Sequence, residues 1–124
     1  MSAEPSRSRT PRPEPPSRLL RMVRTNPPTF RDFLSFEARN QPRPPGISER
    51  EWAGVSMFGD WNSLLAMLRR VRHLRTGLCA VVEIVPGAGV EVQQTFQPGH
   101  YTVWADPDTL LRSVVEVIED ERLR

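Results

Sequence analysis

The side chains best suited to chemistry gather in one twelve-residue stretch, HYTVWADPDTLL, which runs from His100 to Leu111. It holds one of the two histidines, the only tyrosine and one of the three tryptophans. An extended backbone would place His100 and Trp104 on one face of a strand and Tyr101 on the other. Such a polar and aromatic strip can stack on or hydrogen-bond a ligand, so His100 and Trp104 are ligand-binding candidates. A half-buried surface with local partners explains the same strip, and both interpretations stay open.

The two aspartates of this stretch have structural explanations. Asp106 is typical of a helix cap, Pro107 suits the first helical position, and Asp108 lies near the positive end of the helix that follows. We therefore predict a short helix over residues 107–112.

A carboxylate interrupts each of two apolar segments. Glu83 lies in LCAVVEIV and Glu116 lies in SVVEVIED. A buried carboxylate is costly unless it is paired or faces a cleft, so Glu116 is a catalytic candidate. An edge position that faces water is the alternative.

Several kinds of chemistry are excluded by composition. The chain has no lysine among its 17 basic residues, which excludes Schiff-base catalysis and a Walker-type phosphate loop. Its single cysteine, Cys79, allows no internal disulfide, and HExxH, GxSxG, GxGxxG and paired-cysteine motifs are absent. Because His73 and His100 are the only histidines, we expect no metal site. The arginine bias suggests a GC-rich, bacterial genome.

Charge divides the chain in two. Residues 1–28 hold six arginines and two glutamates, and residues 29–124 hold eleven arginines and thirteen acids. Nucleic-acid binding through the arginine-rich tail and Arg69 to Arg75 is therefore a weak alternative. No apolar run near the start is long enough for a signal peptide or a membrane span, so we expect a cytoplasmic protein with no membrane partner.

Composition also suggests where the domain begins. Residues 1–28 contain seven of the thirteen prolines, which predicts a disordered tail with at most a short apolar element over residues 19–23. Translation from Met22 instead of Met1 is an open alternative. Residues 29–124 are predicted to form a single domain.

The predicted fold of this domain is α+β, with a mostly antiparallel, twisted sheet of about five strands and two main helices. Periodicity places the helices at about 29–40 and 60–75, with a helical turn capped by Ser48. Strands are expected in WAGVSMF, LCAVVEIV, VEVQQTF, HYTVWA and SVVEVIED.

The order of elements from Trp52 onward resembles the small ADP-ribosyltransferase-like fold, which includes rifampin-modifying and uncharacterised bacterial groups. The resemblance covers residues 52–120 and depends on GVSMF before a helix, AVVEIVPG, VEVQQTF and GHYTVWADPDTLLRSVVEVIE. It implies that Ser56 matches the family's strand hydroxyl, which helps to shape a nicotinamide-dinucleotide pocket. Tyr101 and Glu116 would be further pocket candidates.

The resemblance also implies a histidine or arginine on an early strand. No histidine precedes His73, and Arg31, Arg39 and Arg50 lie on predicted helix or loop. Of these, Arg50 is our ligand-binding candidate.

Two main functions follow from the sequence. The first is a non-catalytic interaction or accessory domain, with an unknown protein partner and no cofactor, on a degenerate ADP-ribosyltransferase-like fold. The second is an ADP-ribosyl-transferring enzyme or toxin that uses NAD.

Overall fold

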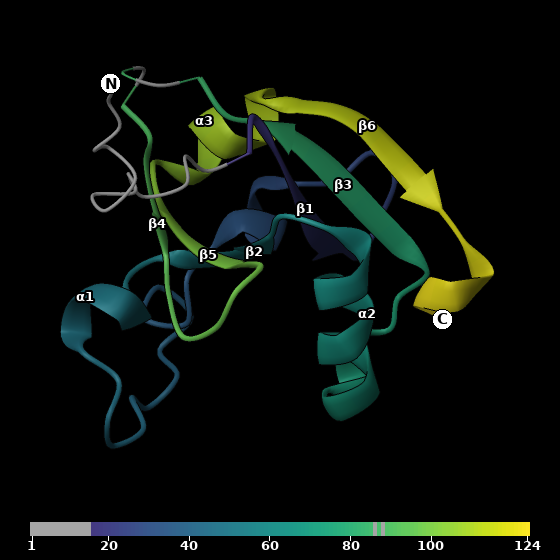
Figure 1. Ribbon diagram of the computed structural model, residues 1–124. Coiled ribbons are helices and arrows are strands. Elements are labelled where there is room, and N and C mark those ends of the chain that lie inside the picture. Colours follow the sequence, from purple (N-terminus) through teal and green to yellow (C-terminus); the bar gives the residue numbers. More distant parts are fainter. Residues whose placement is uncertain (1–15, 86, 88) are drawn as a thin grey trace, which may run out of the picture.

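The computed structural model describes residues 16–85, 87 and 89–124. Within them one antiparallel sheet has the strand order β4-β5-β2-β1-β3-β6 (Figure 1). The strands are β1 Arg18–Val23, β2 Val55–Phe58, β3 Leu78–Glu83, β4 Glu91–Gln94, β5 His100–Trp104 and β6 Val114–Glu119. The α-helices are α1 Glu49–Trp52, α2 Trp61–Arg70 and α3 Pro107–Arg112, and the 3-10 turns are η2 Phe30–Phe33, η3 Arg72–Leu74 and η4 Glu121–Leu123. The α+β prediction is confirmed, with six strands in the described residues where about five were expected.

The additional strand, β1, corrects the predicted boundary at residue 28. Arg18–Val23 lies inside the sheet, where it pairs along its whole length with β3 and at one position with β2. Leu19 and Val23 are fully buried. The predicted disorder is therefore wrong for residues 18–23, while residues 1–15 of the predicted tail lie outside the described residues. A chain that began at Met22 would lack most of this central strand.

The predicted helix over residues 29–40 is replaced by the short turn η2. Its start was predicted correctly, because Thr29 and Asp32 form a capping box. The Asp32 carboxylate also accepts a hydrogen bond from the backbone N–H of Arg24 at 3.0 Å, which ties the turn to the end of β1. Leu34 then adopts an extended conformation, and the helix ends after one turn. Tertiary bonding thus overrides the helical periodicity.

The other helices follow the sequence more closely. Predicted helix 60–75 divides into α2 and η3, and the Asp60 side chain caps α2 by accepting from the N–H of Ser63 at 2.8 Å. The helical turn capped by Ser48 is confirmed, as is the helix over residues 107–112. Asp106 occupies the cap position of α3, but its side chain makes no capping hydrogen bond.

The four central strands of the sheet are largely buried on both faces, whereas the edge strands β4 and β6 are more exposed. One face carries Val55, Met57, Tyr101 and Val103, and packs against Phe33 of η2 and Leu110 of α3 in the larger hydrophobic cluster. The opposite face packs against α2, in the cluster Leu20, Phe58, Leu64, Leu68, Cys79, Val81 and Leu123. Figure 1 shows β6 running beside β3, with the C-terminus near the end of this pair. Among the described residues, no helix has the length and apolar character needed to cross a bilayer.

Candidate functional site

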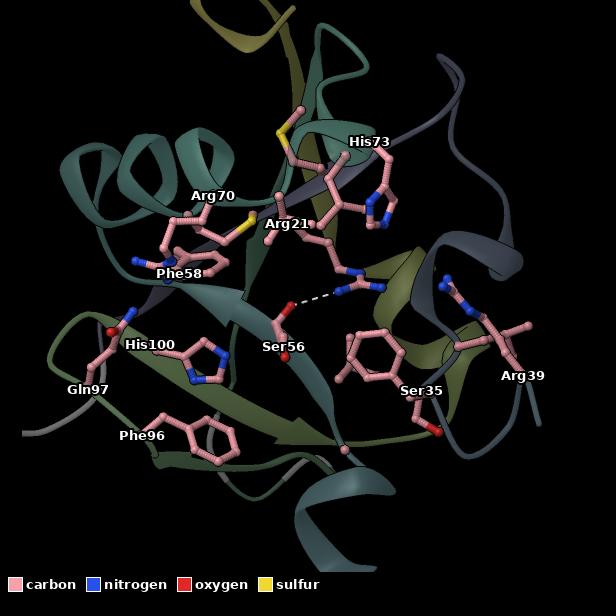
Figure 2. A pocket seen from close by; sticks show the side chains of 18 residues that line it. Arg21, Ser35, Arg39, Ser56, Phe58, Arg70, His73, Phe96, Gln97 and His100 are labelled. Carbon is pink, nitrogen blue, oxygen red and sulfur yellow. Dashed lines mark hydrogen bonds between the residues drawn. The ribbon is translucent and has the colours of Figure 1, made fainter. Parts of the chain in front are cut away.

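A gap opens in the sheet where β1 and β2 separate. The two strands pair only at Leu20 and Phe58. Beyond that pair the Arg21 side chain replaces the missing ladder, because its Nη1 donates to the carbonyl oxygen of Ser56 at 2.8 Å (Figure 2). Its Nε donates to the carbonyl oxygen of Asp32 at 2.5 Å. One guanidinium therefore connects β1, β2 and η2.

A cavity of about 400 Å³ lies at this gap. Its walls come from the sheet, from α2 and η3, and from the segment of residues 34–39. Figure 2 shows Ser56 between the ring of His100 and the guanidinium of Arg21, with Ser35 and Arg39 across the cavity. The aromatic residues in the lining are Phe36, Phe58 and Phe96.

The charged side chains that line this first cavity are all arginines. The lining contains Arg21, Arg39 and Arg70 together with both histidines, and no aspartate or glutamate. Within the described residues none of these three arginines forms an ion pair. Burial and, to a smaller extent, the nearby charge of Arg39 lower the pKa of Arg21 to about 10, against the opposing effect of Asp32. An anion would relieve this unfavourable concentration of positive charge.

A second cavity, of about 760 Å³, adjoins the first. Arg21, Arg39 and His73 line both cavities, so two guanidinium groups lie at their junction. The second cavity is more polar, with Thr25, Thr29, Gln41, Thr76 and two further arginines, Arg24 and Arg31, in its lining. Its one carboxylate, Asp32, already accepts hydrogen bonds from the backbone.

Two of the predicted site residues meet in the first cavity. Ser56 of β2 lies opposite Thr102 of β5, and Phe58 lies opposite His100, so Ser56 and His100 share a sheet face. His100 is buried, and its Nδ1 lies 3.0 Å from Thr95 Oγ1. Burial lowers the pKa of His100, although the Thr95 carbonyl opposes this shift.

The predicted grouping of Ser56 with Tyr101 and Glu116 does not occur. Tyr101 neighbours His100 in β5, and strand alternation therefore buries it in the core on the other face. Glu116 is exposed on β6, and two strands, β1 and β3, separate β6 from β2. Neither residue lines either cavity. The position of Glu116 therefore matches the alternative interpretation, an edge position that faces water.

Trp104 and Arg50 form a separate surface cluster. The Arg50 guanidinium lies 4.0 Å from the centre of the Trp104 ring and forms an ion pair with Glu91 at 2.6 Å. Trp104 Nε1 donates to the Arg50 carbonyl oxygen at 2.8 Å. These local contacts match the alternative explanation of Trp104, and neither residue lines the two cavities.

Sequence reasoning missed Arg21, which lines both cavities. It was assigned to the proline-rich tail, although a single arginine inside LLRMV is the same kind of signal as Glu116 in its apolar segment. Among the described residues, no three histidine, cysteine, aspartate or glutamate side chains gather in a way that could hold a metal ion.

Comparison with known proteins identifies no relative, because no family model, curated protein or solved structure matches the chain. The resemblance to ADP-ribosyltransferase-like folds therefore remains a prediction.

Proposed function

We propose that the protein binds a nicotinamide dinucleotide across the two adjoining cavities, with the pyrophosphate at Arg21 and Arg39. One observation carries this proposal: two cavities meet at shared arginines, within a lining of the first cavity that has no carboxylate. A dinucleotide has the matching form, since two ring-bearing ends flank a central anion. Guanidinium groups are well suited to bind phosphate oxygens in pairs.

The position of Arg21 also supports the resemblance described above. That resemblance implies a histidine or arginine on an early strand and a hydroxyl residue on a strand that precedes a helix. Arg21 lies on β1, Ser56 lies on β2, and the two are joined by a hydrogen bond. The Ser56 side chain makes no hydrogen bond with the rest of the described chain, and the residue lines the first cavity.

The geometry supports binding more directly than ADP-ribosyl transfer. Transfer breaks the glycosidic bond between nicotinamide and ribose, and a carboxylate near the ribose would stabilise the positive charge that develops there. The first cavity has no such carboxylate in its lining. We therefore favour an accessory domain that responds to the dinucleotide, and regard transfer as the second candidate.

Calorimetric titration of the full chain with NAD⁺ tests the proposal. We expect saturable binding at millimolar ligand or below, accompanied by a rise in the melting temperature. Arg39→Gln should weaken binding at least about tenfold, since it removes one charged contact to phosphate. Arg72→Gln is the matched control, because Arg72 is exposed and lines neither cavity.

Two outcomes would count against this function. Absence of binding at millimolar NAD⁺ overturns it, and equal affinities of the Arg39→Gln and Arg72→Gln variants overturn the assigned phosphate position. Nicotinamide released during incubation with NAD⁺ would favour the second candidate, transfer, over simple binding.

A further inference from the structure

His100 offers an unused acceptor atom to the first cavity. Its Nδ1 contacts the Thr95 carbonyl oxygen at 3.2 Å as well as the Thr95 hydroxyl. Because a carbonyl oxygen only accepts, the contact with the Thr95 carbonyl is a hydrogen bond when Nδ1 carries the proton, and we assign the proton there. The hydroxyls of Thr95 and Thr102 lie 2.6 Å apart, and one of them donates a hydrogen bond to the other. Nε2 is then an acceptor with no partner among the described residues.

Phe96 lies beside the His100 ring in an unusual conformation. Its φ is +63°, a region that bulky side chains rarely adopt, and 59% of its surface is exposed. The turn is held by backbone hydrogen bonds from Thr95 N to His100 O at 3.1 Å and from His100 N to Gln97 O at 3.2 Å. The ring meets the edge of His100 with 5.1 Å between centroids. The chain thus keeps an exposed aromatic ring at the cavity.

We propose that His100 and Phe96 select the ligand: His100 Nε2 accepts a hydrogen bond from the carboxamide N–H of nicotinamide, and Phe96 packs against the nicotinamide ring. This inference rests on the proposed function and assigns its orientation. Nicotinamide is the smaller base, and the first cavity is the smaller one, at about 400 Å³ against about 760 Å³. The adenosine end then occupies the second cavity.

The chemistry of this acceptor predicts discrimination between close analogues. Nicotinic acid adenine dinucleotide has a carboxylate in place of the carboxamide, so it has no N–H to donate to Nε2. Its carboxylate oxygens only accept hydrogen bonds, so they would face the lone pair of His100 Nε2 with no proton between them. A buried acceptor left without a donor is unfavourable. Arg70 lines the same cavity and would attract the carboxylate. Preference for NAD⁺ is therefore a specific consequence of the His100 contact.

The test compares NAD⁺, nicotinic acid adenine dinucleotide and ADP-ribose by calorimetry on the full chain. We expect NAD⁺ to bind at least about tenfold tighter than the acid analogue, and His100→Ala to remove that difference. Phe96→Ala should weaken the binding of NAD⁺ but leave the affinity for ADP-ribose unchanged. Phe96→Tyr should bind both ligands as the wild type does. Val115→Ala is the control for loss of an exposed apolar side chain, since Val115 lies on β6 away from both cavities.

The outcomes separate this inference from the proposed function. If all three ligands bind with equal affinity, or if His100→Ala keeps the preference while circular dichroism shows an intact fold, the selection by His100 is wrong and dinucleotide binding stands. If Phe96→Ala lowers the affinity for ADP-ribose as much as the affinity for NAD⁺, the placement of the nicotinamide ring is wrong. If none of the three binds, the proposed function fails and this inference fails with it.

Discussion

The guanidinium of Arg21 donates to the carbonyl oxygen of Ser56 at 2.8 Å, across the point where β1 and β2 no longer pair. The same side chain reaches the Asp32 carbonyl. Arginine can make both contacts because its donors form a rigid fork, whereas a lysine ammonium is a single point of charge.

We therefore expect Arg21→Lys to destabilise the fold by about 1–3 kcal/mol, since at least one of these carbonyl groups would lose its donor. Urea denaturation measures this change. Arg18→Lys on the same strand is the control, because Arg18 is exposed and its contact with Glu83, at 3.8 Å, is a surface ion pair. Its stability should change by less than about 1 kcal/mol. Equal stability of the two variants would show that Arg21 does not support the gap.

Deletion of residues 1–21 is expected to abolish cooperative folding. The shortened chain, which begins at Met22, would lack Leu19 and Leu20, which are buried on opposite faces of the sheet. The deletion would also remove most of the residues that pair with β3. Thermal unfolding followed by circular dichroism should show no cooperative transition. A chain that begins at Pro16 keeps all of β1 and serves as the control, and a normal transition in the shorter chain would contradict a structural role for β1.

Strand β1 was missed because its evidence is not local. Its apolar stretch, LLRMV, is short and interrupted by Arg21, and prolines and arginines surround it. Its conformation is fixed by pairing with β3, about 60 residues later in the sequence, as in the contact between Leu19 and Val82. By contrast, β3 and β5 carry their own β-branched and aromatic residues, and the sequence predicted both.

The candidate site was predictable only in part, for a related reason. Alternation along one strand correctly put His100 and Tyr101 on opposite faces. It does not specify which strands are neighbours, so it could not separate Glu116 from Ser56. Arg21 was not considered because the strand that carries it had not been predicted.

Two glycines allow the stability lost through backbone strain to be distinguished from the stability lost through a steric clash. Gly99 and Gly46 have nearly the same φ, +86° and +87°. A Cβ at Gly99 would clash with the Ser63 side chain on α2, whereas a Cβ at Gly46 has nothing within 4 Å. Gly46→Ala should lower the free energy of unfolding by about 1–2 kcal/mol through backbone strain alone. Gly99→Ala should lose at least about 1 kcal/mol more, because β5 and α2 must move apart.

Urea denaturation of the two glycine variants compares them directly. Gly46→Ala is the control for Gly99→Ala, because it imposes the same backbone conformation without the clash. If both variants lose the same stability, Gly99 is required for its backbone conformation only, and the close approach of Ser63 has no energetic consequence.

Cys79 is expected to resist thiol reagents in the folded protein. It is fully buried, and burial raises the pKa of its thiol to about 12, although a backbone hydrogen bond from Arg21 opposes the shift. Reaction requires the thiolate, so labelling at about pH 8 should proceed only as fast as the protein opens. Labelling in guanidinium chloride provides the control. Rapid labelling of native protein would mean that the β3 face is accessible.

His100 should make the fold sensitive to mild acid. Burial lowers its pKa below the ordinary 6.5, and the cationic Arg70 in the same cavity adds no stabilisation for a charged ring. Between the lowered folded pKa and 6.5, the unfolded chain binds more protons than the native one, so stability falls as pH drops below 6.5. The carboxyl of Asp120, whose pKa its contacts with Arg122 lower to about 2, loses its contribution only at a more acidic pH, below 3.8. Urea denaturation between about pH 7 and pH 5 should therefore show a loss of up to about 1.4 kcal/mol per pH unit in the wild type and a smaller loss in His100→Gln. Equal slopes in the two proteins would show that His100 titrates alike in the folded and unfolded chains.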